Sequence, residues 1–103
     1  MFLVLWEFDV KQGCKERFGS VYGPDGDWAQ LFRRDPAYLR TLLLRDLFRE
    51  LTYLTCDFWE NREVYKAFLL ANSNAYHALD KTCEGLTLAE RKIGAYERLT
   101  DSE

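Results

Sequence analysis

Apolar and polar residues alternate at the start of the chain as they do in a β-strand with one buried face. The run from 2 to 10 carries only apolar residues on one side, namely Phe2, Val4, Trp6, Phe8 and Val10. Leu3 and Leu5 precede Glu7 and Asp9 on the other side, which is therefore half apolar. This period of two predicts a strand over residues 2–10 with both faces at least partly covered.

Two helical patterns follow this strand. Apolar residues recur at helical spacing from Cys14 to Tyr22 and predict a helix that lies on the sheet, ended by the turn at residues 23–26. Trp28, Leu31 and Phe32 predict a second, short helix, with Asp27 capping its free amide groups. Asp35-Pro36 ends that helix, because the residue before a proline disfavours helical backbone.

Two strands are expected next, over residues 38–45 and 51–59, where aromatic, β-branched and leucine residues are frequent. The short link at 46–50 suits an antiparallel hairpin. The link carries Leu47 and Phe48 where such links are usually polar. Exposed apolar tips often mark contacts, so this tip either extends an interface, forms a lid or packs on its own monomer.

A broken helix and a last strand complete the pattern. Asn61 is a good N-cap for a helix that runs to Cys83, with a bend or break at residues 72–74. Residues 87–90, Thr-Leu-Ala-Glu, have the capping-box pattern and predict a single helical turn. The last strand then spans residues 93–99, and we expect residues 100–103 to form a frayed tail.

The resulting order β-α-β-β-α-β predicts one α+β domain over residues 1–99 with a ferredoxin-like antiparallel sheet. Its helices cover one face of that sheet. Since the strands place apolar residues on both faces, the second face needs another partner, and a symmetric copy is the common solution. The pattern therefore predicts a homodimer.

Composition narrows the possible partners. The chain has 103 residues, of which 48% are hydrophobic and 16% aromatic, more large apolar side chains than one small core needs. A ligand or a partner is therefore expected. The net charge of −3 and the pI near 5.2 argue against nucleic acid. The apolar run 2–6 is too short for a secretory or membrane segment, so we expect a cytoplasmic protein that crosses no membrane.

The cysteines and the single histidine argue against a disulfide framework and against a metal site. Cys14, Cys56 and Cys83 are an odd number of widely spaced cysteines, and we interpret them as small buried hydrophobic residues. His77 is the only histidine, so a bound zinc or non-haem iron is not expected.

Four segments of the chain are distinctive: Gly-Pro-Asp-Gly-Asp-Trp at 23–28, Tyr-Leu-Arg-Thr-Leu-Leu at 38–43, Asp-Phe-Trp-Glu at 57–60 and Leu-Thr-Leu-Ala-Glu-Arg at 86–91. With them the chain resembles the antibiotic biosynthesis monooxygenase family of dimeric α/β barrels, and the resemblance extends from Trp6 to Tyr96. The resemblance implies a homodimer whose two sheets form a barrel, with a small-molecule pocket between sheet and helices in each subunit. Some relatives oxidise polycyclic phenols without metal or flavin, and others degrade haem.

The chain departs from both enzymatic patterns of that family. Phe68 stands where the oxygenating members carry an indole on the helix after the third strand. The haem-degrading members have an Asn on the first strand and a His on the later helix, where this chain offers Trp6 or Glu7 and Asp80 or a displaced His77. We therefore expect no haem and no other cofactor.

Oxygenation without a cofactor needs a base that ionises the substrate inside a dry pocket. Our candidates are His77, whose ordinary pKa is near neutrality, and Asp57, on the strand face of Tyr53 and Thr55. The alternatives are a solvated or hydrogen-bonded structural role for His77 and, for Asp57, a salt bridge with an arginine such as Arg40 or Arg45 or exposure at the dimer rim. The candidate pocket residues, for which core packing is the alternative, are Tyr22, Trp28, Phe32, Trp59, Tyr65, Phe68 and Tyr76.

Two hypotheses of function remain open from the sequence. The first is a cofactor-independent monooxygenase that acts on an aromatic or phenolic small molecule. The second is a non-catalytic homodimer of the same fold that binds an apolar small molecule or has a structural role.

Overall fold

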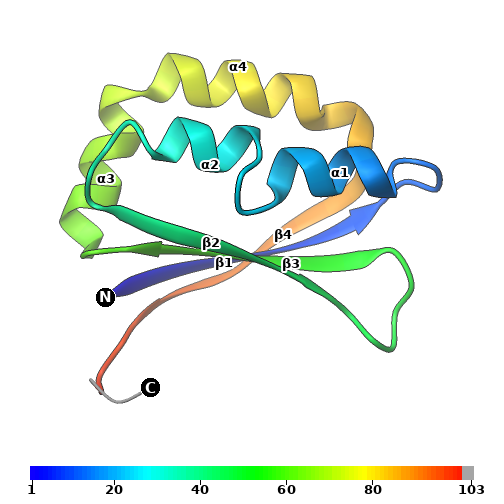
Figure 1. Ribbon diagram of the computed structural model, residues 1–103, viewed down its shortest axis with the longest axis horizontal. Coiled ribbons are helices and arrows are strands. Elements are labelled where there is room, and N and C mark those ends of the chain that lie inside the picture. Colours follow the sequence, from blue (N-terminus) through cyan, green and yellow to red (C-terminus); the bar gives the residue numbers. More distant parts are fainter. Residues whose placement is uncertain (101–103) are drawn as a thin grey trace.

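Four antiparallel strands form one sheet in the order β2-β3-β1-β4, and the helices gather over one of its faces (Figure 1). The structure is a computed structural model that describes residues 1–100. The strands are β1 (Phe2–Val10), β2 (Tyr38–Arg45), β3 (Thr52–Trp59) and β4 (Thr87–Glu97). The helices are α1 (Lys15–Tyr22), α2 (Asp27–Phe32), α3 (Arg62–Ala71), α4 (Ser73–Cys83) and the 3₁₀ turn η1 (Glu84–Leu86). The predicted ferredoxin-like α+β fold is confirmed.

The first strand has the predicted bounds and lies inside the sheet, between β3 and β4. Phe2, Val4, Phe8 and Val10 are buried beneath the helices, as the alternation predicts. Leu3 and Leu5 point to the other face and are half-buried. A strand with neighbours on both sides and apolar residues on both faces forms the centre of the domain.

Two helix boundaries lie at asparagines where the sequence predicts them. The Asn61 side chain accepts a hydrogen bond from the Val64 N–H at 2.9 Å, so the predicted N-cap of α3 is confirmed. Asn72 separates α3 from α4, where a break was expected. Because Asn72 also donates its amide to the Phe68 carbonyl at 3.1 Å, its side chain terminates the first of the two helices.

The cap of α2 was predicted wrongly. Gly26, not Asp27, is the N-cap, and Asp27 is the first helical residue with no capping hydrogen bond from its side chain. The turn presses against the end of α1, where a Cβ on Gly26 would lie 2.4 Å from the Val21 carbonyl oxygen. Only glycine fits that approach, so sterics decide the cap position.

The predicted helical turn at residues 87–90 is also wrong. These residues open strand β4, which pairs with β1 from Phe2↔Glu97 to Val10↔Thr87, and the only helical turn nearby is η1 just before them. A capping box stabilises the start of a helix by about 1 kcal/mol. Pairing with β1 satisfies the backbone groups along the whole inner side of β4, which outweighs that preference. The strand ends at Glu97, before the predicted Leu99, and residues 101–103 of the predicted tail lie outside the described residues.

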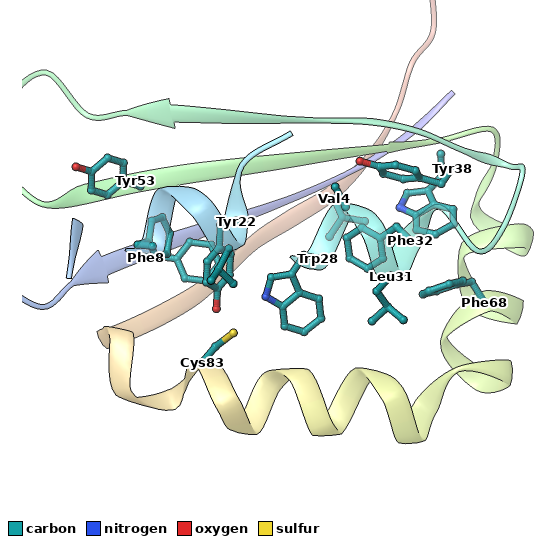
Figure 2. Close-up of a cluster of buried hydrophobic side chains, with 14 of the residues drawn as sticks. Val4, Phe8, Tyr22, Trp28, Leu31, Phe32, Tyr38, Tyr53, Phe68 and Cys83 are labelled. Atoms are coloured by element: carbon teal, nitrogen blue, oxygen red, sulfur yellow. The ribbon is translucent and has the colours of Figure 1, made fainter. Parts of the chain in front are cut away.

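An aromatic core fills the space between sheet and helices (Figure 2). Trp59 and Phe18 are fully buried, and Phe68 is 1% exposed. The Trp59 ring lies 5.1 Å from that of Phe68 and 5.4 Å from those of Tyr38 and Tyr65. The contacts with Tyr38 and Tyr65 are edge-to-face, a geometry that stabilises the core beyond the burial of the rings themselves.

No helix within residues 1–100 covers the opposite face of the sheet (Figure 1). Leu42 and Leu44 on β2 and Tyr96 on β4 are 40%, 47% and 49% exposed on this outer face. Beside them the Arg40 guanidinium lies 4.4 Å above the Phe58 ring. We call this apolar area the outer face.

Ion pairs occupy one end of the outer face. Arg91 pairs with Glu7 at 2.8 Å and with Asp9 at 3.0 Å, and Arg49 pairs with Glu7 at 2.7 Å. Hydrogen bonds from Arg91, then from Arg49, lower the pKa of Glu7.

No helix within residues 1–100 has the length and hydropathy needed to cross a membrane.

Candidate functional site

A pocket lies between the sheet and the helix layer and draws its lining from every strand. The space inside it, part of which is open to solvent, is about 460 Å³. Its lining residues are Trp6 and Phe8 of β1, Tyr22 of α1, Trp28 and Phe32 of α2, Thr41 of β2, Thr55 and Asp57 of β3, Tyr76 and Asp80 of α4, and Glu90 of β4. Most of its wall is therefore aromatic, and its few polar groups come from the sheet and α4.

Four of the seven predicted pocket residues lie in this wall, namely Tyr22, Trp28, Phe32 and Tyr76. The Trp28 ring is the centre of that group, at 4.8 Å from Tyr76, 5.9 Å from Phe32 and 6.1 Å from Tyr22. Helical spacing brings these side chains together, because each lies on the face of its helix that points to the sheet.

The other three predicted pocket residues, Trp59, Tyr65 and Phe68, pack together in the core beside the pocket and do not line it. Phe68 and Trp59 are buried on all sides. Core packing, the alternative considered for each aromatic residue, describes their contacts.

Asp57 is the acidic group among the residues of β3 that line the pocket. Thr41 donates a hydrogen bond from Oγ1 to Asp57 Oδ1 at 2.6 Å. Because Thr41 has a single hydroxyl proton, the Tyr38 hydroxyl is the donor in the 2.7 Å bond to Thr41 Oγ1. The relay Tyr38–Thr41–Asp57 fixes one carboxyl oxygen and leaves the side chain facing the pocket.

Burial raises the pKa of Asp57 to about 6, against an ordinary value of 3.8, and the Thr41 hydrogen bond only partly opposes that rise. Neither Arg40 nor Arg45 pairs with it: Arg40 lies on the outer face over Phe58, and no described residue forms an ion pair with Asp57. A carboxylate with a pKa near neutrality is suited to accept a proton from a weak acid.

His77 is placed differently. It is exposed on α4 and is not part of the pocket wall, and its ring lies 6.1 Å from that of Tyr76. The structure thus brings Asp57, but not His77, to the predicted pocket residues. A catalytic role for His77 stays a prediction without a contact in the pocket.

The buried indole N–H groups of Trp28 and Trp59 make no hydrogen bond of ordinary geometry within residues 1–100, but the Trp28 N–H is close enough to the Tyr22 hydroxyl to act on it and lower the pKa of that phenol. The Trp59 donor lies in the core, whereas Trp28 belongs to the pocket wall. Figure 2 shows the Trp28 nitrogen on the side of its ring that faces Tyr22, whose hydroxyl lies beside the Cys83 thiol. Burial also raises the pKa values of Tyr22 and Tyr76, so both phenols stay protonated at neutral pH.

The sequence did not predict six of the residues that line the pocket, namely Trp6, Phe8, Thr41, Thr55, Asp80 and Glu90. Asp80 could have been found, since it follows Tyr76 by four residues and shares its helix face. Glu90 could not have been found, because the sequence wrongly predicts a helical turn at 87–90 and so gives no indication that Glu90 pairs with Phe8 in the sheet.

No group of three or more His, Cys, Asp or Glu side chains within residues 1–100 is arranged to hold a metal ion. Cys56 and Cys83 are buried and Cys14 is half-buried, and all three are free thiols. Burial raises the pKa of Cys56 to about 11, so this thiol is unreactive at neutral pH.

Comparison with known proteins gives structural relatives only. No family model matches the sequence, and no curated protein matches it. Among solved structures, SnoaB, a cofactor-independent oxygenase from Streptomyces nogalater, aligns over 99% of this chain and 97% of its own, with a TM-score of 0.75 and 21% identity. A protein provisionally named an antibiotic biosynthesis monooxygenase, from Deinococcus radiodurans, aligns over 100% and 97%, with a TM-score of 0.70 and 17% identity.

A third structure, again provisionally named an antibiotic biosynthesis monooxygenase and from Nitrosomonas europaea, covers 97% of this chain and 100% of its own at a TM-score of 0.66 and 15% identity. The chain has the fold of the antibiotic biosynthesis monooxygenases. The resemblance predicted from the four sequence segments is thereby confirmed at the level of the fold, over nearly the full length of the monooxygenase-type chains.

Proposed function

We propose that this protein belongs to the antibiotic biosynthesis monooxygenase family and oxidises an aromatic small molecule with molecular oxygen and no prosthetic group. The observation that carries the proposal is Asp57, a partly buried carboxylate that opens on an aromatic pocket and has a pKa of about 6. The name of SnoaB as a cofactor-independent oxygenase supports the class of reaction.

The pocket residues suit a substrate that ionises to an enolate or phenolate. Asp57 takes the proton, and the Thr41 hydroxyl keeps its carboxyl group in place while the aromatic wall excludes water. The substrate anion then reduces oxygen, a C–O bond forms, and the resulting hydroperoxide loses water as its O–O bond breaks. A CH₂ group has become a carbonyl, one oxygen molecule has supplied both the carbonyl and the water, and no external reductant is used.

Oxygen uptake with anthrone, a tricyclic ketone in equilibrium with its enol, tests this proposal. The wild-type protein is expected to consume oxygen faster than the spontaneous reaction. Asp57→Asn keeps the shape and the acceptor for Thr41 but removes the base, and should lower kcat/KM by about 100-fold or more. His77→Ala, outside the pocket, should leave it unchanged.

Either of two results would count against the proposal: no uptake above the spontaneous rate with the wild-type protein, or full activity of Asp57→Asn. Activity lost in His77→Ala but retained in Asp57→Asn would move the base to α4.

A non-catalytic binding protein is the second candidate, and one residue favours it. Phe68 stands where the resemblance to oxygenating members implies an indole, and it is 1% exposed in the core without a polar group to offer. Saturable binding of anthrone without any oxygen uptake would identify this second function.

The outer face supports a further part of the proposal, the homodimer. Leu42, Leu44 and Tyr96 expose apolar surface that no element of the described chain covers. Self-association through this face would bury it, with the pocket of each subunit on the opposite side of its sheet.

A further inference from the structure

Strand β2 is irregular at the end that lies next to the pocket. Tyr38 pairs with Trp59 and Arg40 pairs with Phe58, so Leu39 is an extra residue between two successive partners on β3. An extra residue of this kind is a β-bulge, which bends a strand and re-aims the side chains on either side of it. Leu39 and Arg40 are accordingly both exposed.

The bulge brings two hydroxyl groups to the helix side of the sheet. Successive residues of a regular strand point to opposite faces, so Tyr38 and Thr41, three positions apart, would lie on opposite faces without it. Instead both are buried, at 8% and 4% exposure, and their hydroxyl oxygens are 2.7 Å apart. The relay that ends on Asp57 therefore exists because the strand is bulged.

Burial fixes the direction of this relay. The Tyr38 hydroxyl is a buried donor, and its acceptor within residues 1–100 is Thr41 Oγ1. With Tyr38 donating, the single proton of Thr41 is directed to Asp57 Oδ1 at 2.6 Å. Reversal of the relay would take this acceptor from the Tyr38 proton, which costs free energy in a buried site.

The two carboxyl oxygens of Asp57 consequently differ. Oδ1 accepts the hydrogen bond from Thr41, whereas Oδ2 receives none from residues 1–100. A hydrogen bond to an oxygen stabilises the negative charge on it and weakens it as a base. Oδ2 is therefore the more basic of the two oxygens.

No charged side chain competes with this control of Asp57. Burial raises its pKa, and the hydrogen bond from Thr41 opposes that rise. Arg33 and Asp25, which pair with each other at 3.0 Å, act in opposite directions on the pKa of Tyr38. The titratable groups on the elements around Asp57 are phenols, a thiol and two acids of the pocket wall, namely Tyr38 on β2, Cys56 on β3, Tyr65 on α3, Tyr76 and Asp80 on α4, and Glu90 on β4.

We propose that Tyr38, turned inward by the bulge at Leu39, is a positioning residue that directs the Thr41 proton to Asp57 Oδ1 and leaves Oδ2 to take the substrate proton. This inference rests on the proposed function and deepens it. In that step the substrate C–H bond breaks, its electron pair stays on the substrate, and the proton forms a bond with Oδ2. Oδ1 still accepts from Thr41 afterwards, so the relay keeps its direction throughout.

The pKa of Asp57 tests the relay without any substrate. The ¹³C carboxyl signal of Asp57, assigned by its absence in Asp57→Asn, is followed by NMR from pH 4 to pH 9. Thr41→Val keeps the shape but removes the donor and should raise the pKa of Asp57 by about 1. Tyr38→Phe leaves the Thr41 proton undirected and should raise it by about 0.5. Thr41→Ser keeps the hydroxyl and should restore the wild-type value.

Tyr53→Phe is the matched control for Tyr38→Phe. Tyr53 is also a strand tyrosine with 8% exposure that packs under the helices, at 5.3 Å from the Phe18 ring, but it does not line the pocket. Its substitution should leave the pKa of Asp57 unchanged. With anthrone, the pH at which kcat/KM for oxygen uptake reaches half its maximum should rise in Tyr38→Phe and Thr41→Val as the pKa does, and stay in place in Tyr53→Phe.

The result that overturns the role of Tyr38 is an equal pKa of Asp57 in wild type and Tyr38→Phe, or an equal rise in Tyr38→Phe and Tyr53→Phe. Oxygen uptake by the wild-type protein together with either result would leave the proposed function standing. The expected pKa changes without any oxygen uptake would overturn the proposed function, and Oδ2 as its base, while the relay itself stands. Should Thr41→Val fail to fold, the two Tyr→Phe variants decide the matter.

Discussion

Asp57 occupies a position that costs the folded state free energy. Its carboxyl group receives one hydrogen bond, from Thr41, and has no cationic partner within the described chain. A group in such surroundings favours its neutral form, and folding then depends on pH in the direction opposite to that of a salt-bridged acid. The surface acids Glu7 and Asp9, with lowered pKa values, act in the usual direction.

The direction of this pH dependence follows from the pKa of Asp57, which is about 6 in the folded state and ordinarily 3.8. Between these values the folded protein binds more protons than the unfolded chain, so the contribution of Asp57 to stability falls as pH rises from 4 to 7. Asp57→Asn removes this loss and should gain about 2 to 3 kcal/mol relative to wild type over that range. Urea unfolding of both proteins at pH 4 and pH 7 measures the difference, and an equal offset at the two pH values would contradict it.

Residue chemistry alone did not identify the site. Residue type alone indicates His77, because an imidazole ordinarily titrates near neutrality, yet His77 is exposed; strand alternation indicates Asp57, and Asp57 lines the pocket. Periodicity shows which face a side chain occupies, so it predicts convergence better than residue type does. Which aromatic residues line the cavity and which fill the core depends on packing of α3 against the end of β3, and no local pattern contains that information.

At the scale of elements, the sequence predicted almost every helix and strand, and the errors share one cause. Asp27 and residues 87–90 both carry good local capping chemistry, and in both places a tertiary constraint prevailed. At Gly26 the constraint is the approach of the turn to α1, and at β4 it is the pairing of β1. Local preferences of about 1 kcal/mol are readily overridden by such contacts.

Two glycines test the first of these constraints. Gly26→Ala would place a Cβ 2.4 Å from the Val21 carbonyl oxygen and should destabilise the protein by about 1–3 kcal/mol. Gly19→Ala, inside α1 with no atom within 4 Å of the added Cβ, should stabilise it by about 0.5–1 kcal/mol. Urea titration at one pH compares them; equal effects of the two substitutions would show that the turn relaxes away from α1.

At the scale of the whole molecule, the two faces of the sheet differ: the described helices cover one face and leave the outer face exposed (Figure 1). If the outer face joins two copies, light scattering should give the mass of a dimer at micromolar concentration. Leu42→Glu places a charge on that face in exchange for an apolar side chain and should raise the dissociation constant about tenfold or more.

Leu70→Glu is the matched control for this substitution, because Leu70 is 82% exposed on α3, away from the outer face. It should leave the association unchanged. A monomeric wild-type protein would contradict the dimer, and an equal effect of the two variants would exclude the outer face as its interface.

The central position of β1 has a consequence for how the protein is made. Among the four strands of the sheet β1 leaves the ribosome before the others, and one of its two partners, β4, leaves after them, with Phe2 paired to Glu97 and Glu7 bonded to Arg91 across 84 positions. Until residues 87–97 emerge, one edge of β1 exposes unpaired backbone groups that could join another chain. The sheet is therefore completed only when its last strand, β4, has emerged, and until then the open edge of β1 is the part of the domain most exposed to pairing with another chain.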